Sequence, residues 1–270
     1  MENEENLKKL QQKLLLIMED IDRVCRENGI CYYLCGGTLL GALRHNGFIP
    51  WDDDLDIYMK YEDFLKFEQV ANKSLKSSFF YQTPNTDMEC KSFGCGRVRF
   101  EGTHFKSNSL PNNWIHNGIF IDVLPLIKVP RNKLIQKIYF YKFQVLSRIV
   151  WLKNGYTPHP NNKLFRLMMW GSYYFTYFIP SVFFEKKLSV YHEKYKNLEQ
   201  YDYIDLLSGS FSGCIHNCNW YDSRTEHCFE DKKFYIPKDP EAILESYYGN
   251  WKELPPIEER VPHHIDGIEF

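Results

Sequence analysis

The stretch PWDDDLDIYM, residues 50–59, predicts a strand that is preceded by an unusual cluster of negative charges. Four carboxylates fall within five positions, directly before an apolar run. Two carboxylates about 4 Å apart repel by roughly 4 kcal/mol at an effective dielectric near 20. The cluster must therefore spread into water or gather around a cation.

Side chains alternate faces along a strand, so Leu55 and Ile57 are expected to enter the core. Asp54 and Asp56 then share the other face, about 7 Å apart along the strand. Two such carboxylates can hold one hard divalent cation whose remaining positions are filled by phosphate oxygens. A solvated acidic loop in which Asp52 caps a turn is the alternative, and the alternation into a strand favours the metal site.

A pair of glycines, Gly36 and Gly37, lies upstream between a short expected strand at 30–34 and helical turns at 38–44. Glycines let a phosphate approach the backbone closely, and the amides at the start of the helix at Thr38 point toward it. The Gly-Gly turn and the acidic strand lie less than twenty residues apart. Together they favour a site for a phosphate-containing substrate more strongly than either alone.

Two further candidates for phosphate binding follow that short helix. Arg44 can clamp phosphate oxygens through two parallel donors, and a surface ion pair with Asp52 or Asp53 is the less favoured alternative. His45 is a second-tier candidate, because a histidine near a carboxylate cluster is often only a hydrogen-bonded neighbour.

The rest of the chain predicts an α/β (α+β) fold, with a mixed sheet core flanked by helices. Apolar residues spaced by three and four predict a helix over 7–24 that ends near Gly29 and docks on its own domain. A strand at 55–59 precedes a helix at 61–71, and further strands are expected at 97–101 and 119–126. Asp122 lies inside the last of these, and its residue position leaves a metal or base role and a satisfied strand-end aspartate equally open.

Residues 134–200 form an aromatic-rich, helical subregion in which residues 167–184 carry no charge. Eighteen uncharged residues are the minimum for a transmembrane span, but Gly171 and Pro180 interrupt them. A helix of the core or of a lobe is the preferred interpretation. Contact with a membrane surface comes second, and a membrane span third.

Composition narrows the classes of function. A net charge of -2, from 33 basic and 35 acidic residues, gives no basic field to attract nucleic acid. The polar start of the chain predicts a cytoplasmic protein without a signal peptide, so the eight cysteines are expected to be reduced. A zinc group is a minor alternative to ordinary side chains for a set without standard finger spacing: Cys214, His216, Cys218, His227 and Cys228.

The segment LCGGTLLGALRHNGFIPWDDDLDIYMKYEDFLKF, residues 34–67, resembles the signature of the LicD family. This family belongs to the nucleotidyltransferase-like superfamily and includes the fukutin-related proteins. Weaker similarities are GIFIDVLPL at 118–126, IPKDPEAILESYYGNWKELPP at 236–256, and the histidines at 263–264. The resemblance implies one catalytic domain over residues 1–270 with a nucleotidyltransferase-like sheet.

The resemblance also implies a reaction. Family members transfer phosphocholine, or another alcohol phosphate such as ribitol phosphate, from a CDP-alcohol to a hydroxyl of a cell-surface glycan, lipopolysaccharide or teichoic acid precursor, and CMP leaves. The implied metal is Mg²⁺, with Mn²⁺ as the alternative. Its implied ligands are Asp54, Asp56 and Asp122, and the Gly-Gly turn falls on Gly36 and Gly37.

Some fukutin-related members carry an N-terminal anchor and a cysteine zinc site, neither of which is recognisable in this chain. The bacterial, cytoplasmic branch therefore fits better, with a lipid-linked acceptor at the inner membrane face and a contact through residues 167–184. Two other functions stay open at this point: nucleotidyl transfer that releases pyrophosphate, and a non-catalytic scaffold at a membrane surface.

Overall fold

A computed structural model describes residues 2–87, 90, 94–105, 116–153, 163–206, 213–262 and 267–270. The histidines at 263–264 lie outside these residues.

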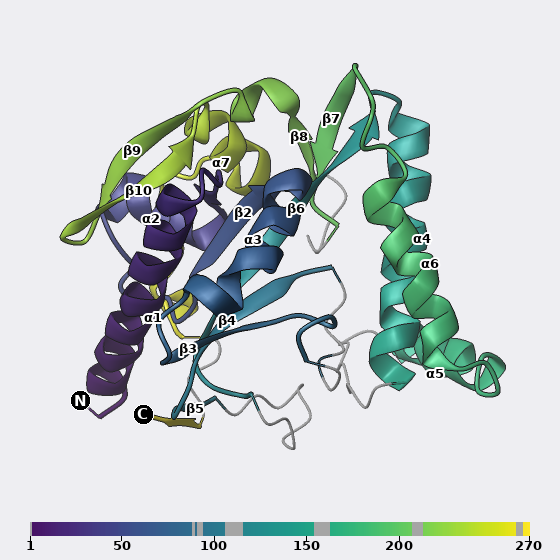
Figure 1. The fold of residues 1–270 in the computed structure, drawn as a ribbon, viewed down its shortest axis with the longest axis horizontal. Helices are drawn as coiled ribbons and strands as arrows, with labels where there is room; N and C mark the ends of the chain where they lie inside the picture. Colours follow the sequence, from purple (N-terminus) through teal and green to yellow (C-terminus); the bar gives the residue numbers. More distant parts are fainter. Residues whose placement is uncertain are drawn as a thin grey trace.

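A mixed seven-stranded sheet forms the centre of the described chain (Figure 1). Its strands are β1 (Tyr33–Leu34), β2 (Asp56–Lys60), β3 (Phe79–Gln82), β4 (Gly96–Phe100), β6 (Phe120–Pro130), β7 (Tyr201–Ile204) and β8 (Ile215–Asn217). The order is β1-β2-β6-β4-β3, with β7 paired to the far half of β6 and β8 to β7. Strands β2 and β6 run parallel, and every other neighbouring pair of the described sheet is antiparallel. The predicted α/β class with a mixed sheet is confirmed.

Two small antiparallel ribbons and several helices surround this sheet. The ribbons are β9 (Arg224–Phe229) with β10 (Lys232–Pro237), and β5 (His104–Phe105) with β11 (Ile268–Glu269). The helices are α1 (Glu2–Glu27), α2 (Gly36–His45), α3 (Tyr61–Ser74) and α7 (Pro240–Tyr248), with short 3-10 turns η1 (Cys218–Tyr221) and η2 (Ile257–Glu259).

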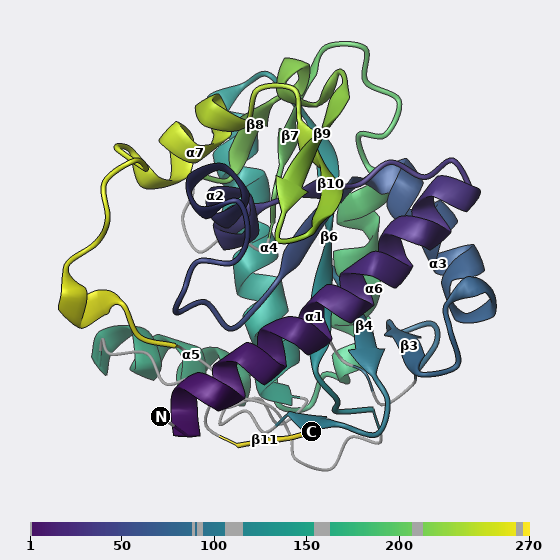
Figure 2. The same cartoon turned by 90° about the vertical axis from the view of Figure 1, so that its left-hand side faces the viewer.

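Helix α1 confirms the helix predicted at 7–24 and its docking. The side chains at the predicted spacing, from Leu7 to Val24, are all buried in the core of the same chain, so they are not available to a coiled coil. Gly29 ends the segment with a φ of +62, which favours glycine. Figure 2 shows α1 crossing in front of the sheet, on the side away from α4 and α6.

Three helices form a separate lobe at one end of the molecule (Figure 1): α4 (Lys133–Lys153), α5 (Lys163–Phe175) and α6 (Ser181–Glu193). A second hydrophobic core joins this lobe to the far half of β6, through Ile127 and Val129 from the strand and through Phe143 and Phe184 from the helices. The uncharged stretch 167–184 is thus split between two helices. No helix in the described residues is long and apolar enough to cross a membrane.

Candidate active site

A row of three charged residues crosses adjacent strands of the sheet. Asp56 of β2 and Asp122 of β6 are partners in the parallel ladder, and Arg97 of β4 is the antiparallel partner of Asp122. Partnered positions on neighbouring strands place their side chains on the same face. The Nε atom of Arg97 donates a hydrogen bond of 2.7 Å to Oδ1 of Asp122. Two carboxylates predicted from widely separated segments therefore lie side by side.

The start of β2 differs from the expectation. Leu55 and Ile57 are fully buried as predicted, but the strand begins at Asp56 and leaves Asp54 in the loop before it. The last residue of β1, Leu34, pairs with Ile57, and the chain then turns into α2. The pairing between β1 and β2 does not extend to Asp54. The direction of the Asp54 side chain is therefore not set by the alternation of side chains along β2.

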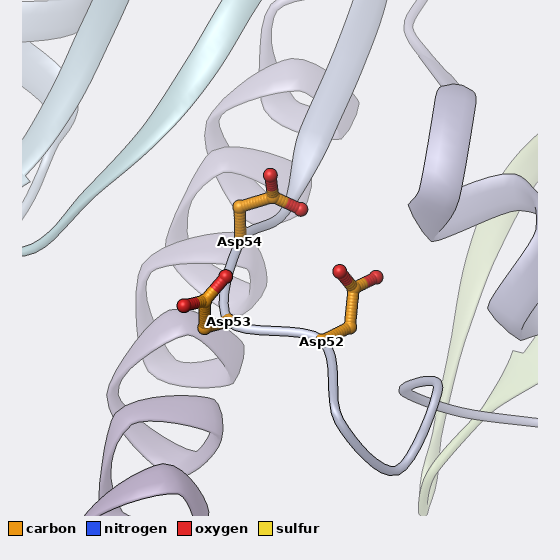
Figure 3. A group of neighbouring side chains, drawn as sticks. All are labelled: Asp52, Asp53 and Asp54. Carbon is orange, nitrogen blue, oxygen red and sulfur yellow. The ribbon is translucent and has the colours of Figure 1, made fainter. Parts of the chain in front are cut away.

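The loop before β2 gathers three carboxylates. One oxygen from each of Asp52, Asp53 and Asp54 lies within 4.8 Å of the others. Figure 3 shows the carboxylates of Asp52 and Asp54 on the same side of the chain, with Asp53 turned away from them. Asp53 is buried, whereas Asp52 and Asp54 are partly exposed. Asp52, which the sequence assigned only to the loop, therefore belongs to the site.

The carboxylates at this edge of the sheet disfavour one another's charge. Burial, followed by the charges of Asp54 and Asp53, raises the pKa of Asp52 to about 8. Burial, followed by the charges of Asp54 and Asp122, raises the pKa of Asp56 well above its ordinary value. Oxygen donors crowded in this way fit a hard divalent cation, whose charge would relieve the repulsion.

The Gly-Gly turn lies against this acidic loop. Helix α2 begins at Gly36, and no side chain of its N-cap residue, Cys35, caps the first turn. Gly36 has a φ of +52, and a Cβ atom there would meet nothing within 4 Å. A Cβ atom on Gly37 would lie 3.1 Å from Oδ2 of Asp52. The start of α2 thus presents backbone amides beside open space and beside the carboxylates, as binding of a diphosphate requires.

Thr38 supports the site from below. Its buried hydroxyl accepts a hydrogen bond of 2.9 Å from the backbone amide of Asp56. This bond fixes the first residue of β2 against α2, so Thr38 positions Asp56. A direct contact of Thr38 with substrate stays a prediction.

Arg44 and His45 lie at the other end of α2, about 12 Å along the helix axis from the glycines. The Nη1 atom of Arg44 donates to the carbonyl oxygens of Trp251 and Glu253 at 3.0 and 3.1 Å, and its Nε atom donates to Nε2 of His45 at 3.0 Å. These bonds tie the segment after α7 to α2. The alternative of an ion pair with Asp52 or Asp53 does not appear among these contacts, and the phosphate clamp stays a prediction.

The five residues considered for zinc do not converge. His216 is fully buried, and its Nδ1 and Nε2 atoms hydrogen-bond to the hydroxyls of Tyr221 and Tyr247 at 2.5 and 2.8 Å. His227 and Cys228 lie on β9, and neither belongs to a described group with metal-ligand spacing. Within the described residues, the group with metal-ligand spacing is Asp52, Asp53 and Asp54, and the predicted trio of Asp54, Asp56 and Asp122 does not have this spacing.

His216 instead belongs to a buried polar network behind Asp56. Tyr58, two residues beyond Asp56 on the same face of β2, donates to Oδ2 of Asp205 at 2.8 Å and lies 2.7 Å from the hydroxyl of Tyr247. Tyr247 in turn joins His216. The network connects β2, α7 and the end of β7. Sequence reasoning missed it, along with Arg97, and the available signal was the position of Tyr58 two residues after Asp56.

The mixed sheet, the acidic loop and the Gly-Gly turn together define an α/β domain with a candidate site for a metal and a phosphate group. Residues 29–147 match the family model described as "LicD/FKTN/FKRP, nucleotidyltransferase domain". All the residues of the charged row and of the Gly-Gly turn fall inside this range. Residues 29–147 therefore form a domain of the LicD family, as the resemblance over residues 34–67 predicts.

Individual relatives extend this result. The chain is 28% identical over 271 residues, 96% of each protein, to the lipopolysaccharide cholinephosphotransferase LicD of Haemophilus influenzae. It is 32% identical over 109 residues, 40% of this chain and 19% of the relative, to the ribitol 5-phosphate transferase FKRP of Mus musculus. An uncharacterized protein of Rickettsia typhi, RT0683, is 47% identical over 57 residues, 21% of this chain and 18% of that protein.

Proposed function

We propose that this protein is an enzyme that transfers an alcohol phosphate, phosphocholine or a related group, from a CDP-alcohol to a hydroxyl of a cell-surface glycan precursor. The observation that carries the proposal is the alignment of Asp56 with Asp122 across parallel strands, beside the acidic loop and the open turn at Gly36. A LicD relative named as a cholinephosphotransferase, similar over nearly the whole chain, supports this choice of reaction.

The proposed metal site uses Asp54 and Asp56, with Asp122 as the third carboxylate and Asp52 at its edge. Mg²⁺, or Mn²⁺ in its place, would supply positive charge to the diphosphate of the donor. The amides at Gly36 and Gly37 bind the phosphate oxygens from the other side, because they begin α2 without a side-chain cap. Thr38 positions Asp56 by accepting a hydrogen bond from its backbone amide.

Transfer then requires one bond to form and one to break. The acceptor hydroxyl oxygen bonds to the phosphorus that carries the alcohol, and the bond from that phosphorus to the bridging oxygen breaks, so that CMP leaves with the electron pair. A carboxylate accepts the proton of the hydroxyl. Asp122 suits this role or completes the metal site, since the hydrogen bond from Arg97 to its Oδ1 atom holds its carboxylate in place.

Product identity tests the proposal. The purified protein is incubated with CDP-choline, CDP-ribitol and CDP-glycerol, each with Mg²⁺ and a glycan acceptor fraction, and CMP release is measured. We expect CMP from at least one donor, and none when EDTA replaces Mg²⁺. Pyrophosphate formation from CTP and an alcohol phosphate, without CMP, would establish nucleotidyl transfer in its place. Neither product, together with no binding of any CDP-alcohol, would favour a scaffold.

A further inference from the structure

Charge is distributed unevenly between the helical lobe, residues 131–200, and the rest of the chain. The lobe carries twelve Lys and Arg residues against three Asp and Glu, whereas the remainder carries 21 against 32. Residues 131–184 contain no acidic residue at all. A segment of one charge sign inside a chain of nearly neutral total charge indicates a surface that binds a partner of opposite charge.

The same lobe exposes large apolar side chains along α5 and at the turn between α5 and α6. Phe175 and Phe178 are 90% and 93% exposed, and Leu167 and Tyr174 are 69% and 67% exposed. Single exposed apolar residues are ordinary, but a contiguous group of them marks an interaction site. We call residues 174–179, with Leu167 and Trp170, the aromatic tip, and Figure 1 shows the turn at the outer end of the lobe.

Lysines adjoin the exposed aromatic side chains. The Nζ atom of Lys187 lies 4.6 Å from the ring centroid of Phe183, which is half exposed. The Nζ atom of Lys153 donates to the carbonyl oxygen of Tyr177 at 3.3 Å and lies 5.7 Å from the ring of Tyr173. An aromatic ring beside an ammonium group suits the boundary between lipid headgroups and acyl chains.

A groove between α4 and α6 repeats this combination. Its two adjoining hollows have volumes of about 430 and 610 Å³. Apolar side chains including Ile138, Val145 and Val190 line them, and Lys142, Lys187 and Lys194 stand among these side chains. The lobe thus presents apolar surface bordered by positive charge along its helices as well as at its tip.

We propose that the aromatic tip and the surrounding lysines dock this protein on an anionic lipid bilayer. The rings of Phe175 and Phe178 enter the headgroup boundary, and the lysines pair with lipid phosphates. A projecting turn with side chains exposed on this scale suits insertion into a soft interface, whereas a stable protein interface needs a broad complementary face. The absence of acidic residues from 131–184 removes the repulsion that an anionic surface would otherwise meet.

Vesicle cosedimentation tests this proposal directly. The full chain is mixed with vesicles of phosphatidylcholine alone and with vesicles containing phosphatidylglycerol, at 0.1 M and 0.5 M salt. We expect binding to the anionic vesicles that weakens at least tenfold at the higher salt. The double variant Phe175→Ser/Phe178→Ser should bind at least tenfold more weakly, and so should Lys142→Glu/Lys187→Glu.

The matched control is Leu254→Ser/Ile257→Ser, which removes exposed apolar side chains outside the lobe and should bind like the parent protein. Circular dichroism checks that each variant is folded. No binding to anionic vesicles, or equal binding by the Phe175→Ser/Phe178→Ser variant, would overturn the proposal. A dimer in light scattering that this variant dissolves would show that a second copy of the chain covers the tip, and would also overturn it.

Two variants separate membrane docking from catalysis. Asp54→Asn should bind anionic vesicles like the parent protein, because its side chain lies in the loop before β2. Phe175→Ser/Phe178→Ser should release CMP from a soluble donor at the parental rate. Loss of vesicle binding in both variants would contradict the lobe as the docking surface without bearing on the reaction.

Discussion

The acidic edge of the sheet and the helical lobe have opposite charge. The edge is partly buried and held by specific hydrogen bonds, whereas the lobe exposes many of its side chains. At the edge, carboxylates are held by strands and by specific hydrogen bonds, such as those to Arg97 and Thr38. In the lobe, basic side chains on α4 and α6 and aromatic side chains on α5 and α6 are exposed. A rigid sheet can hold several carboxylates close together for chemistry. A surface that binds a lipid bilayer needs only exposed basic and aromatic side chains.

The matched family domain follows the same division. It ends at residue 147, within α4, so that it contains the whole acidic edge and little of the lobe. We infer that chemistry resides in the sheet and that the lobe determines where the protein works. The following variants test this division, in order of decreasing effect.

Loss of one carboxylate should abolish transfer without harming the fold. Asp54→Asn removes a proposed metal ligand, and CMP release should fall by more than about 100-fold. Without metal, the variant should melt at the same temperature as the parent protein or higher, because it removes repulsion with Asp52 and Asp56. Asp231→Asn, at an exposed carboxylate in the β9–β10 turn, is the control and should keep full turnover. Retained turnover in Asp54→Asn would remove this residue from the site.

Acid should weaken the protein through His216. Burial lowers the pKa of His216 to about 4, whereas the unfolded chain has a value near 6.5. The unfolded state therefore binds more protons between these values, and stability is full above pH 6.5 and falls as the pH drops toward 4. His216 alone should cost about 2 kcal/mol between pH 8 and pH 5.

Urea unfolding at both pH values measures this loss. His216→Gln, which cannot become charged, should show a smaller difference between pH 8 and pH 5 than the parent protein. An equal difference in both proteins would show that other groups cause the acid sensitivity.

Two glycines offer a direct comparison of the edge with the lobe. Gly36→Ala forces an L side chain into a φ of +52 and should cost about 1–2 kcal/mol of stability. Gly171 lies within α5 with open space around it, so Gly171→Ala should stabilise by about 0.5–1 kcal/mol. Thermal melts of both variants test the signs. A stabilising Gly36→Ala would show that the turn is not constrained.

Exposed rings of the lobe should matter least to folding. Phe178→Ser should change the free energy of unfolding by less than about 0.5 kcal/mol, because the ring is 93% exposed. Phe143→Ala, in the second core, should cost about 3–5 kcal/mol. Denaturant melts of the two variants measure the difference, and a large loss in Phe178→Ser would mean that the tip packs against the protein.

Local signals explain why much of the first half could be predicted. The helix at 7–24, its end at Gly29 and the burial of Leu55 and Ile57 depend on neighbours in the sequence, and all are confirmed. The predicted break at Pro180 also appears as the start of α6. The match of residues 29–147 to the LicD family was predicted from one contiguous segment, residues 34–67.

Long-range pairing explains what the sequence could not reveal. The contact of Arg97 with Asp122 depends on the register of β4 against β6, which no local pattern sets. The link from Tyr58 to Tyr247 joins residues 189 positions apart. Asp54 lies outside β2 because β1, the strand beside it, pairs only with Ile57 and Tyr58. The position of Asp54 thus also depends on a neighbouring strand.

Calorimetry of CDP-choline binding, with and without Mg²⁺, measures whether the acidic edge binds the donor through a metal. The parent protein should bind the donor at least tenfold more tightly with Mg²⁺ than with EDTA. Asp56→Asn should lose this dependence, since its carboxylate stands beside Asp122 at the centre of the charged row. Equal affinity in EDTA and Mg²⁺, or full Mg²⁺ dependence in Asp56→Asn, would contradict the account.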